Sequence, residues 1–361
     1  MTKNASLFTP VQMGELSLPN RVLMAPLTRN RAQSDGVPGP LAATYYRQRA
    51  SAGFIVTEAT QISPMGKGYI DTPGLHSDAQ VAGWREITDS VHAAGGRIFA
   101  QLWHVGRISH SSLLPNGAAP LSSTDKTADA KTVTDQGFVD TSQPQRMTQE
   151  QIKATTEDYR RAAENAKRAG FDGVEVHAAN GYLLDQFLQN GVNDRDDAYG
   201  GTAENRMRFL LEVLDAVETV WPKGRIGVRL SPMNAFNDMS DDDPEALFSA
   251  VYKALDGRGL AYLHVVESYN RAEDSDAKAI MDRLRPLYSG FFVAANEYDG
   301  TSAADAIGFG HAQAVAFGRP FLANPDLPER LRRGADLNTP DEATFYGGGA
   351  EGYTDYPALE T

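Results

Sequence analysis

The chain has 361 residues, of which 41% are hydrophobic, and its formal net charge is −13. This length allows a large buried core, and the acidic balance argues against nucleic acid or an anionic membrane surface as a main partner. The chain has no cysteine, which excludes disulfides, thiolate metal sites, iron–sulfur clusters and a cysteine nucleophile; we assign no metal ligands. Residues 1–6 lack the apolar stretch of a signal, and no apolar run reaches the roughly 18 residues of a membrane span. We therefore expect a cytoplasmic protein.

The first predicted elements are two short strands on either side of Gly14, within residues 7–20. We expect this hairpin to form a lid ahead of the main fold. A strand at 21–28 follows, and then a helix at 41–52 that Gly53 should end.

Strands and helices then alternate along the rest of the chain. Further strands are predicted at 54–60, 98–104, 173–179, 225–230, 260–267, 291–295 and 314–317. Helices are predicted from Asp78, as N-cap, to residue 94, and at 148–169, 203–220 and around 301–310; Asp243 with Pro244 should open another. Eight nearly continuous apolar strands separated by helices favour a single (β/α)8 TIM barrel. No Gly-x-Gly-x-x-Gly motif follows any of these strands, which argues against an open dinucleotide-binding sheet.

The longest interruption is the segment 105–147, after the third strand. It is rich in Ser, Thr, Pro and Gly and has no helical period. A structureless connection of this length is unusual in a compact domain. We therefore expect a capping excursion with short strands of its own, and we treat residues 1–361 as one domain.

The stretch 173–182 carries the clearest chemical signal. An apolar alternating run ends at His177, and Asn180 and Tyr182 follow in the turn. Polar side chains at the C-terminal ends of barrel strands are where such folds keep their active sites. Taken alone, the stretch favours a structural interpretation, in which Asn180 caps the next helix and the other two are core residues.

The other strand ends change that balance, because they also carry polar and aromatic side chains. A convergent set of this kind is typical of a large, mostly apolar pocket with a few polar anchors. The candidates are Pro26, Leu27, Thr28, Glu58, Ala59, Thr60, Gln101, Trp103, His104, Arg229, Asn296, Gly318 and Arg319.

Several longer motifs occur in a fixed order: MAPLTR at 24–29, AQLWHVGR at 100–107, HAANGYL at 177–183, NDR at 193–195, YGG at 199–201, FGRP at 317–320 and FYGGGAEGY at 345–353. Together they resemble the Old Yellow Enzyme family of flavin-dependent ene-reductases. Within that family the chain is similar to the bacterial branch of pentaerythritol tetranitrate, glycerol trinitrate and N-ethylmaleimide reductases. The likeness covers essentially the whole chain.

The resemblance implies a bound FMN that NADPH or NADH reduces. Thr28 would donate to the flavin near O4, Gln101 would face the pyrimidine edge, and Arg229 would stabilise the anionic reduced ring. Gly318 and Arg319 would hold the phosphate. The alternatives are a strand-end cap for Thr28, a local backbone bond for Gln101 and a structural ion pair for Arg229. The remaining expected cofactor contacts are Pro26, Leu27, Ala59 and Asn296.

The loop after the seventh strand departs from the family pattern. The family usually has glycine there, whereas this chain has Asn296 and Glu297. Asparagine tolerates a left-handed backbone, so the geometry of the phosphate site can be kept. A glutamate near a phosphate is unfavourable unless it points away.

The resemblance also implies the residues that act on the substrate, an activated alkene such as an enone, maleimide or nitroalkene, with nitrate esters or nitroaromatics as further acceptors. His177 and Asn180 would donate to the substrate oxygen, and Tyr182 would protonate the α-carbon. The pocket walls would include Thr28, Tyr69, Trp103 and Tyr353. The alternatives for the last three are a surface turn, a core position and a disordered tail.

Two other functions stay open at this point. One is a flavin-binding protein without turnover, and the other is a barrel lyase or isomerase in which Arg319 grips a phosphorylated substrate. The sequence does not specify the physiological substrate, the choice of nicotinamide donor or the oligomeric state.

Overall fold

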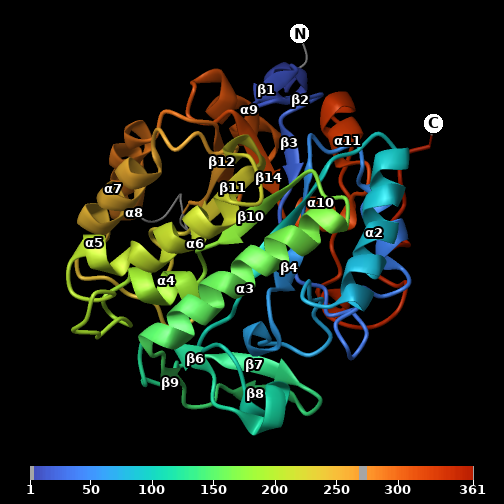
Figure 1. Ribbon diagram of the computed structural model, residues 1–361. Coiled ribbons are helices and arrows are strands. Elements are labelled where there is room, and N and C mark those ends of the chain that lie inside the picture. The colour runs from blue at the N-terminus through green and yellow to red at the C-terminus, as the bar shows by residue number, and fades with distance from the viewer. Residues whose placement is uncertain (1–3, 268–274, 361) are drawn as a thin grey trace.

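The structure is a computed structural model that describes residues 4–267 and 275–360. Eight parallel strands form a closed barrel, in the order β3–β4–β5–β10–β11–β12–β13–β14 and back to β3 (Figure 1). This confirms the predicted (β/α)8 barrel. The strands are β3 Val22–Met24, β4 Ile55–Gln61, β5 Ile98–Trp103, β10 Gly173–His177, β11 Ile226–Leu230, β12 Tyr262–Val266, β13 Phe292–Ala295 and β14 Ala314–Phe317.

Helices cover the outside of the barrel. In α3, for example, the buried residues Ile152, Tyr159, Ala163 and Ala166 recur at helical spacing and form one face. The helices are α1 Ala42–Gln48, α2 Asp78–Ala93, α3 Gln149–Arg168, α4 Leu183–Leu188, α5 Ala203–Arg206, α6 Arg208–Glu218, α7 Pro244–Leu255, α8 Ser275–Leu284, α9 Gly300–Gly308, α10 Arg319–Ala323 and α11 Leu327–Arg333.

The helix starts follow capping chemistry, with one correction. Asp243 accepts a hydrogen bond from the Ala246 backbone N–H at 3.0 Å and Pro244 begins α7, as predicted. The prediction that Asp78 caps α2 is wrong. The N-cap is Ser77, which forms a reciprocal capping box with Gln80.

Two predicted helices differ from those observed, in each case beside a buried arginine. The first ends at Gln48 rather than at residue 52, where Arg49 donates to the carbonyls of Phe321 and Leu322 at 3.1 and 2.6 Å. The helix predicted at 203–220 is divided after Arg206, which donates to the carbonyl of Leu188 at 2.6 Å. These partners are distant in sequence, so local propensity does not indicate them.

The N-terminal hairpin closes the barrel at the end where its strands begin. Strands β1 Val11–Met13 and β2 Leu16–Leu18 are antiparallel. Met13 and Leu18 are buried in the same cluster as the interior aromatics Phe54, Phe99 and Tyr262. The predicted lid therefore lies opposite the end where strand-end side chains gather.

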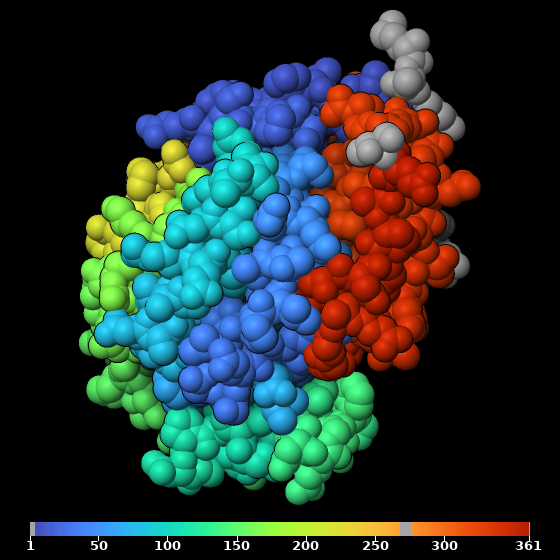
Figure 2. Space-filling model, turned by 90° about the vertical axis from the view of Figure 1, so that its right-hand side faces the viewer, coloured from blue at the N-terminus to red at the C-terminus, as the bar shows by residue number. Residues whose placement is uncertain are grey.

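The excursion after β5 has short strands of its own, as expected. Strand β6 Leu121–Ser122 pairs with β9 Gln145–Arg146, and β7 Lys131–Thr134 forms a hairpin with β8 Gly137–Asp140. Figures 1 and 2 show this capping excursion at the opposite end of the molecule from β1 and β2.

Candidate active site

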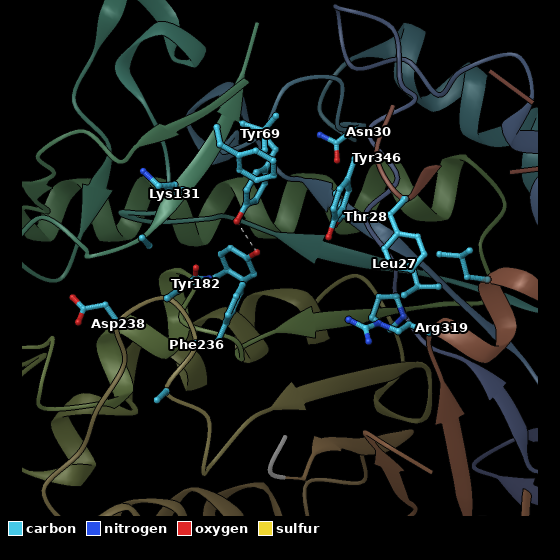
Figure 3. A pocket seen from close by; sticks show the side chains of 18 of the residues that line it. Leu27, Thr28, Asn30, Tyr69, Lys131, Tyr182, Phe236, Asp238, Arg319 and Tyr346 are labelled. Atoms are coloured by element: carbon cyan, nitrogen blue, oxygen red, sulfur yellow. Dashed lines mark hydrogen bonds between the residues drawn. The ribbon is translucent and has the colours of Figure 1, made fainter. Parts of the chain in front are cut away.

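A cavity of about 990 Å³ opens beneath the capping excursion (Figure 3). Its wall combines segments that follow several different strands. The predicted site residues in this wall are Pro26, Leu27, Thr28, Tyr69, Tyr182 and Arg319. The wall also contains residues that the sequence analysis did not select, among them Asn30, Lys131, Phe138, Phe236, Asn237, Asp238, Phe345 and Tyr346.

The turn after β10 has a left-handed backbone at two successive residues, Asn180 with φ 58° and Gly181 with φ 75°. A Cβ on Gly181 would lie 2.7 Å from the carbonyl oxygen of Phe236, so glycine is required there. The Asn180 N–H donates to Ser231 Oγ at 2.7 Å, and the Gly181 N–H donates to Asp185 Oδ2 at 2.9 Å. Neighbouring side chains therefore fix the turn that separates His177 from Tyr182.

The same turn determines the position and the hydrogen-bond partners of Asn180. Tyr182, not Asn180, occupies the N-cap position of α4, so the interpretation of Asn180 as a helix cap is wrong. Asn180 Oδ1 accepts from Asn234 Nδ2 at 3.1 Å. The Asn180 amide group therefore keeps its Nδ2 as the donor for another partner.

Tyr182 lies in an aromatic cluster at the cavity wall. Its hydroxyl is 3.1 Å from that of Tyr69, and its ring meets Trp103 edge-on with centroids 5.0 Å apart. Tyr69 and Trp103 are stacked at 5.7 Å. Burial, together with Tyr69, raises the pKa of Tyr182 well above its usual range, and burial raises the pKa of Tyr69 to about 12. Both phenols are therefore protonated at neutral pH.

His177 is buried at the end of β10, and its ring centroid lies 5.2 Å from that of Tyr182. Burial, followed by the nearby Arg229 and His264, lowers its pKa well below the usual range, so the imidazole is neutral. Within the described part of the chain, His177 Nδ1 is buried and has no hydrogen-bond partner. A ligand in this region could supply that partner.

A polar layer fills the barrel interior below the cavity. Gln101 Nε2 donates to Glu175 Oε1 at 2.7 Å, and His264 Nδ1 lies 2.8 Å from Glu175 Oε2. Burial alone would raise the pKa of Glu175, but His264, Arg229 and Gln101 outweigh it and leave that pKa below its usual range. Arg229 pairs in register with both His177 and His264. Gln101 and Arg229 thus both act on Glu175, Gln101 through a hydrogen bond and Arg229 through its charge.

The predicted phosphate-binding residues lie at the start of α10 and after β13. The Arg319 side chain is 71% exposed and lies 4.0 Å from the Glu342 carboxylate. Asn296 has φ 95°, so the expected left-handed backbone is present. Glu297 is exposed. Asn296 Nδ2 donates to the carbonyl of Glu267 at 2.9 Å.

The placement of Tyr353 in the substrate pocket is wrong. Its buried ring stacks on Tyr45 with centroids 4.2 Å apart, and the guanidinium carbons of Arg29 and Arg31 lie 5.1 and 4.6 Å from its centroid. Tyr346 of the same glycine-rich segment lines the cavity instead. Stacking and cation–π contacts draw Tyr353 into the core.

Trp103 and Ala59 lie behind the cavity wall rather than on it. Both are buried in one cluster with Tyr182. Trp103 supports the rings of Tyr69 and Tyr182, which face the cavity.

Two of the groups of wall residues that the sequence analysis missed come from loops and hairpins outside the recognised motifs. Lys131 and Phe138 come from the β7–β8 hairpin, and Phe236 and Asn237 come from the loop after β11. The sequence signal that could have indicated them is a phenylalanine among polar residues, at positions 138 and 236. Both side chains are exposed in the structure, as is common where a surface binds a ligand.

The fold and the donor set together fit a flavin-nucleotide oxidoreductase built on a barrel. Residues 6–338 match the NADH:flavin oxidoreductase / NADH oxidase family, and the chain belongs to this family. It is therefore an FMN-dependent oxidoreductase of the Old Yellow Enzyme type, reduced by a nicotinamide donor. This decides against a barrel lyase or isomerase and against a flavin-binding protein without turnover.

Known proteins similar to this chain are reductases from plants and bacteria. The chain is 47% identical over 359 residues to 12-oxophytodienoate reductase 1 of Oryza sativa subsp. japonica, which covers 98% of this chain and 93% of the rice protein. Morphinone reductase in complex with tetrahydroNAD superposes with a TM-score of 0.93 and 50% identity, covering 98% of each chain. The Old Yellow Enzyme homologue of Zymomonas mobilis gives a TM-score of 0.95 and 41% identity, covering 98% of this chain and all of that one.

Across residues 4–267 and 275–360, no helix combines the length and apolar character needed to cross a membrane.

Proposed function

We propose that this protein is an ene-reductase that reduces the C=C bond of enones, maleimides and nitroalkenes, and that nitrate esters and nitroaromatics are further acceptors. The observation that carries the proposal is the turn after β10. There a protonated phenol, a neutral imidazole and an amide donor lie within six residues, from His177 to Tyr182. We place the chain near the pentaerythritol tetranitrate, glycerol trinitrate and N-ethylmaleimide reductases of the family.

The residues present fit FMN. The wide cavity and the left-handed backbone at Asn296 are features that a flavin nucleotide would use. FMN supplies the hydride acceptor and donor of the reaction when bound. Thr28 would donate to the ring, Gln101 would face its pyrimidine edge, and Arg229 would provide the cation that favours negative charge there.

The other cofactor contacts divide between the ring and the phosphate. Pro26 and Leu27 would pack along the ring, with Ala59 as support behind the wall, and Gly318, Arg319 and Asn296 would hold the phosphate. Arg319 is exposed and can turn towards a dianion, because its link to Glu342 is long and solvated.

The substrate oxygen is held by His177 and by Asn180 Nδ2. These two donors polarise a carbonyl or nitro group, and they stabilise the negative charge that develops as hydride reaches the β-carbon. Tyr182 then protonates the α-carbon. A phenol with a raised pKa can still give its proton to a carbanion, because the carbanion is far more basic. Thr28 and Tyr69 form pocket walls, with Trp103 as the support behind them.

An anaerobic visible spectrum tests this function. The yellow holoenzyme should bleach when limiting NADPH or NADH is added, and the colour should return with 2-cyclohexenone. Tyr182→Phe should bleach at the same rate and recover more slowly. Bleaching without recovery by any activated alkene would refute the ene-reductase assignment, and equal loss in both steps would refute the role of Tyr182.

A further inference from the structure

The hydroxyls of Tyr69 and Tyr182 face each other across 3.1 Å, and either can be the donor. Figure 3 shows both side chains pointing into the cavity, with the two oxygens joined. Tyr182 is the more deeply buried of the two, whereas Tyr69 is partly exposed. Tyr69 thus lies between the open part of the cavity and Tyr182, the proposed proton donor.

Tyr69 is held in this position from two sides. Its ring stacks on Trp103, and its backbone forms a bridge with Val133 of β7, beside the hydrogen bond from the Ile70 N–H to the Val133 carbonyl at 2.8 Å. The hydroxyl can rotate about its C–O bond while the ring stays fixed. It can therefore donate to Tyr182 without any movement of the chain.

A proton donor in this environment needs support once its proton has left. Burial disfavours the phenolate of Tyr182, and a buried anion is stable only when a hydrogen bond compensates for the lost water. While Tyr182 is protonated, Tyr69 raises the pKa of Tyr182 and the side chain of Asn237 lowers it. Once Tyr182 has lost its proton, the Tyr69 hydroxyl, 3.1 Å away, can turn and donate to the phenolate.

We propose that Tyr69 is a positioning residue that relays a proton to Tyr182 after each turnover; this inference rests on the proposed function. The new C–H bond forms at the substrate α-carbon as the O–H bond of Tyr182 breaks. The Tyr182 oxygen then takes the proton of Tyr69, and Tyr69 takes one from water in the cavity. These steps transfer only protons and change no oxidation state, because the hydride is delivered separately.

A nitroalkene separates the two halves of the reaction, which makes the relay measurable. Hydride addition to 1-nitrocyclohexene gives a nitronate, a stabilised anion with its own ultraviolet absorbance, and its protonation is a later event. Reduced holoenzyme is mixed with the nitroalkene without oxygen. Flavin reoxidation is followed in the visible, and loss of the nitronate in the ultraviolet.

In Tyr69→Phe, flavin reoxidation should keep its rate, while loss of the nitronate should slow about 10- to 100-fold, the rate equivalent of one hydrogen bond to a charged oxygen. A small buffer acid should restore the lost rate in proportion to its concentration. Tyr199→Phe is the matched control. It also removes a phenol hydroxyl, one that donates to Glu212 at 3.0 Å away from the cavity, and it should leave nitronate protonation unchanged.

The relay is refuted if Tyr69→Phe protonates the nitronate at the normal rate, if Tyr199→Phe slows it equally, or if buffer acid gives no recovery. Measurements on Tyr182→Phe distinguish a failure of the relay from a failure of the proposed role of Tyr182. If protonation slows in Tyr182→Phe but not in Tyr69→Phe, only the relay fails. If it slows in neither variant, the role of Tyr182 fails as well. Phenol affinity close to that of the unaltered protein would show that the cavity of Tyr69→Phe is intact.

Discussion

Asp185 is a fully buried carboxyl group whose hydrogen bonds come from neutral donors. Oδ2 accepts from the Gly181 N–H and from Ser231 Oγ, and Oδ1 accepts from Gln189 Nε2. Burial raises its pKa from 3.8 to about 7. The folded protein therefore binds this proton more tightly than the unfolded chain does. The stabilising contribution is complete below about pH 3.8 and is lost as the pH rises to about 7.

The size of this effect follows from the pKa difference. About three pKa units correspond to about 4 kcal/mol in total, of which about 2.5 kcal/mol falls between pH 5 and pH 8. In Asp185→Asn the amide cannot ionise. The variant should therefore gain about 2.5 kcal/mol of unfolding free energy relative to the original protein over that interval. Its neutral carbonyl still accepts the Gly181 N–H.

Urea unfolding followed by far-ultraviolet circular dichroism at pH 5, 6, 7 and 8 measures the difference. Asp197→Asn is a control of opposite sign, because hydrogen bonding to Arg195 lowers the pKa of Asp197. That variant should be destabilised throughout this range. Parallel stability profiles for Asp185→Asn and the original protein would refute the reasoning.

Three further predictions test other parts of the structure. His177→Ala should weaken phenol binding about 10- to 100-fold, since one donor to a phenolate is lost; titration of the flavin spectrum measures this, and unchanged affinity would exclude His177 as a ligand. Glu175→Gln removes the carboxylate that orients Gln101, so FMN should dissociate about tenfold more readily in dialysis, and equal retention would show that Gln101 needs no such support. Tyr353→Ala should cost about 3–5 kcal/mol of unfolding free energy, whereas Tyr346→Ala, at an exposed ring, should cost little; similar losses would contradict the assigned burial.

The barrel could be predicted because its signals are local. Each strand is an apolar run, and the 173–182 stretch shows both the strand and the polar residues at its end. The N-cap of α7 could also be predicted, because all of its contacts lie within four residues, from Asp243 to Ala246. Six of the predicted site residues lie in one cavity wall, because parallel strands bring their C-terminal ends together.

The rest depends on contacts between residues far apart in the chain. The end of α1 follows from Arg49 reaching carbonyls more than 270 positions away. Tyr353 was assigned to the pocket for a similar reason. Tyr346 and Tyr353 lie in one glycine-rich tail, and contacts with the remote residues Tyr45, Arg29 and Arg31 determine which ring is buried. The hairpin that brings Lys131 and Phe138 to the cavity has no local feature that indicates where it folds.

Arg29 ties the C-terminal segment to the loop after the first barrel strand. Its guanidinium donates to the carbonyls of Phe345 and Gly352 at 2.9 and 2.7 Å, and Figure 2 shows this segment lying against the N-terminal part of the chain. Phe345 and Tyr346 of the same segment line the cavity. One wall of the site therefore depends on a hydrogen-bonded contact between the two ends of the chain, and damage to either end would open the cavity without touching the barrel.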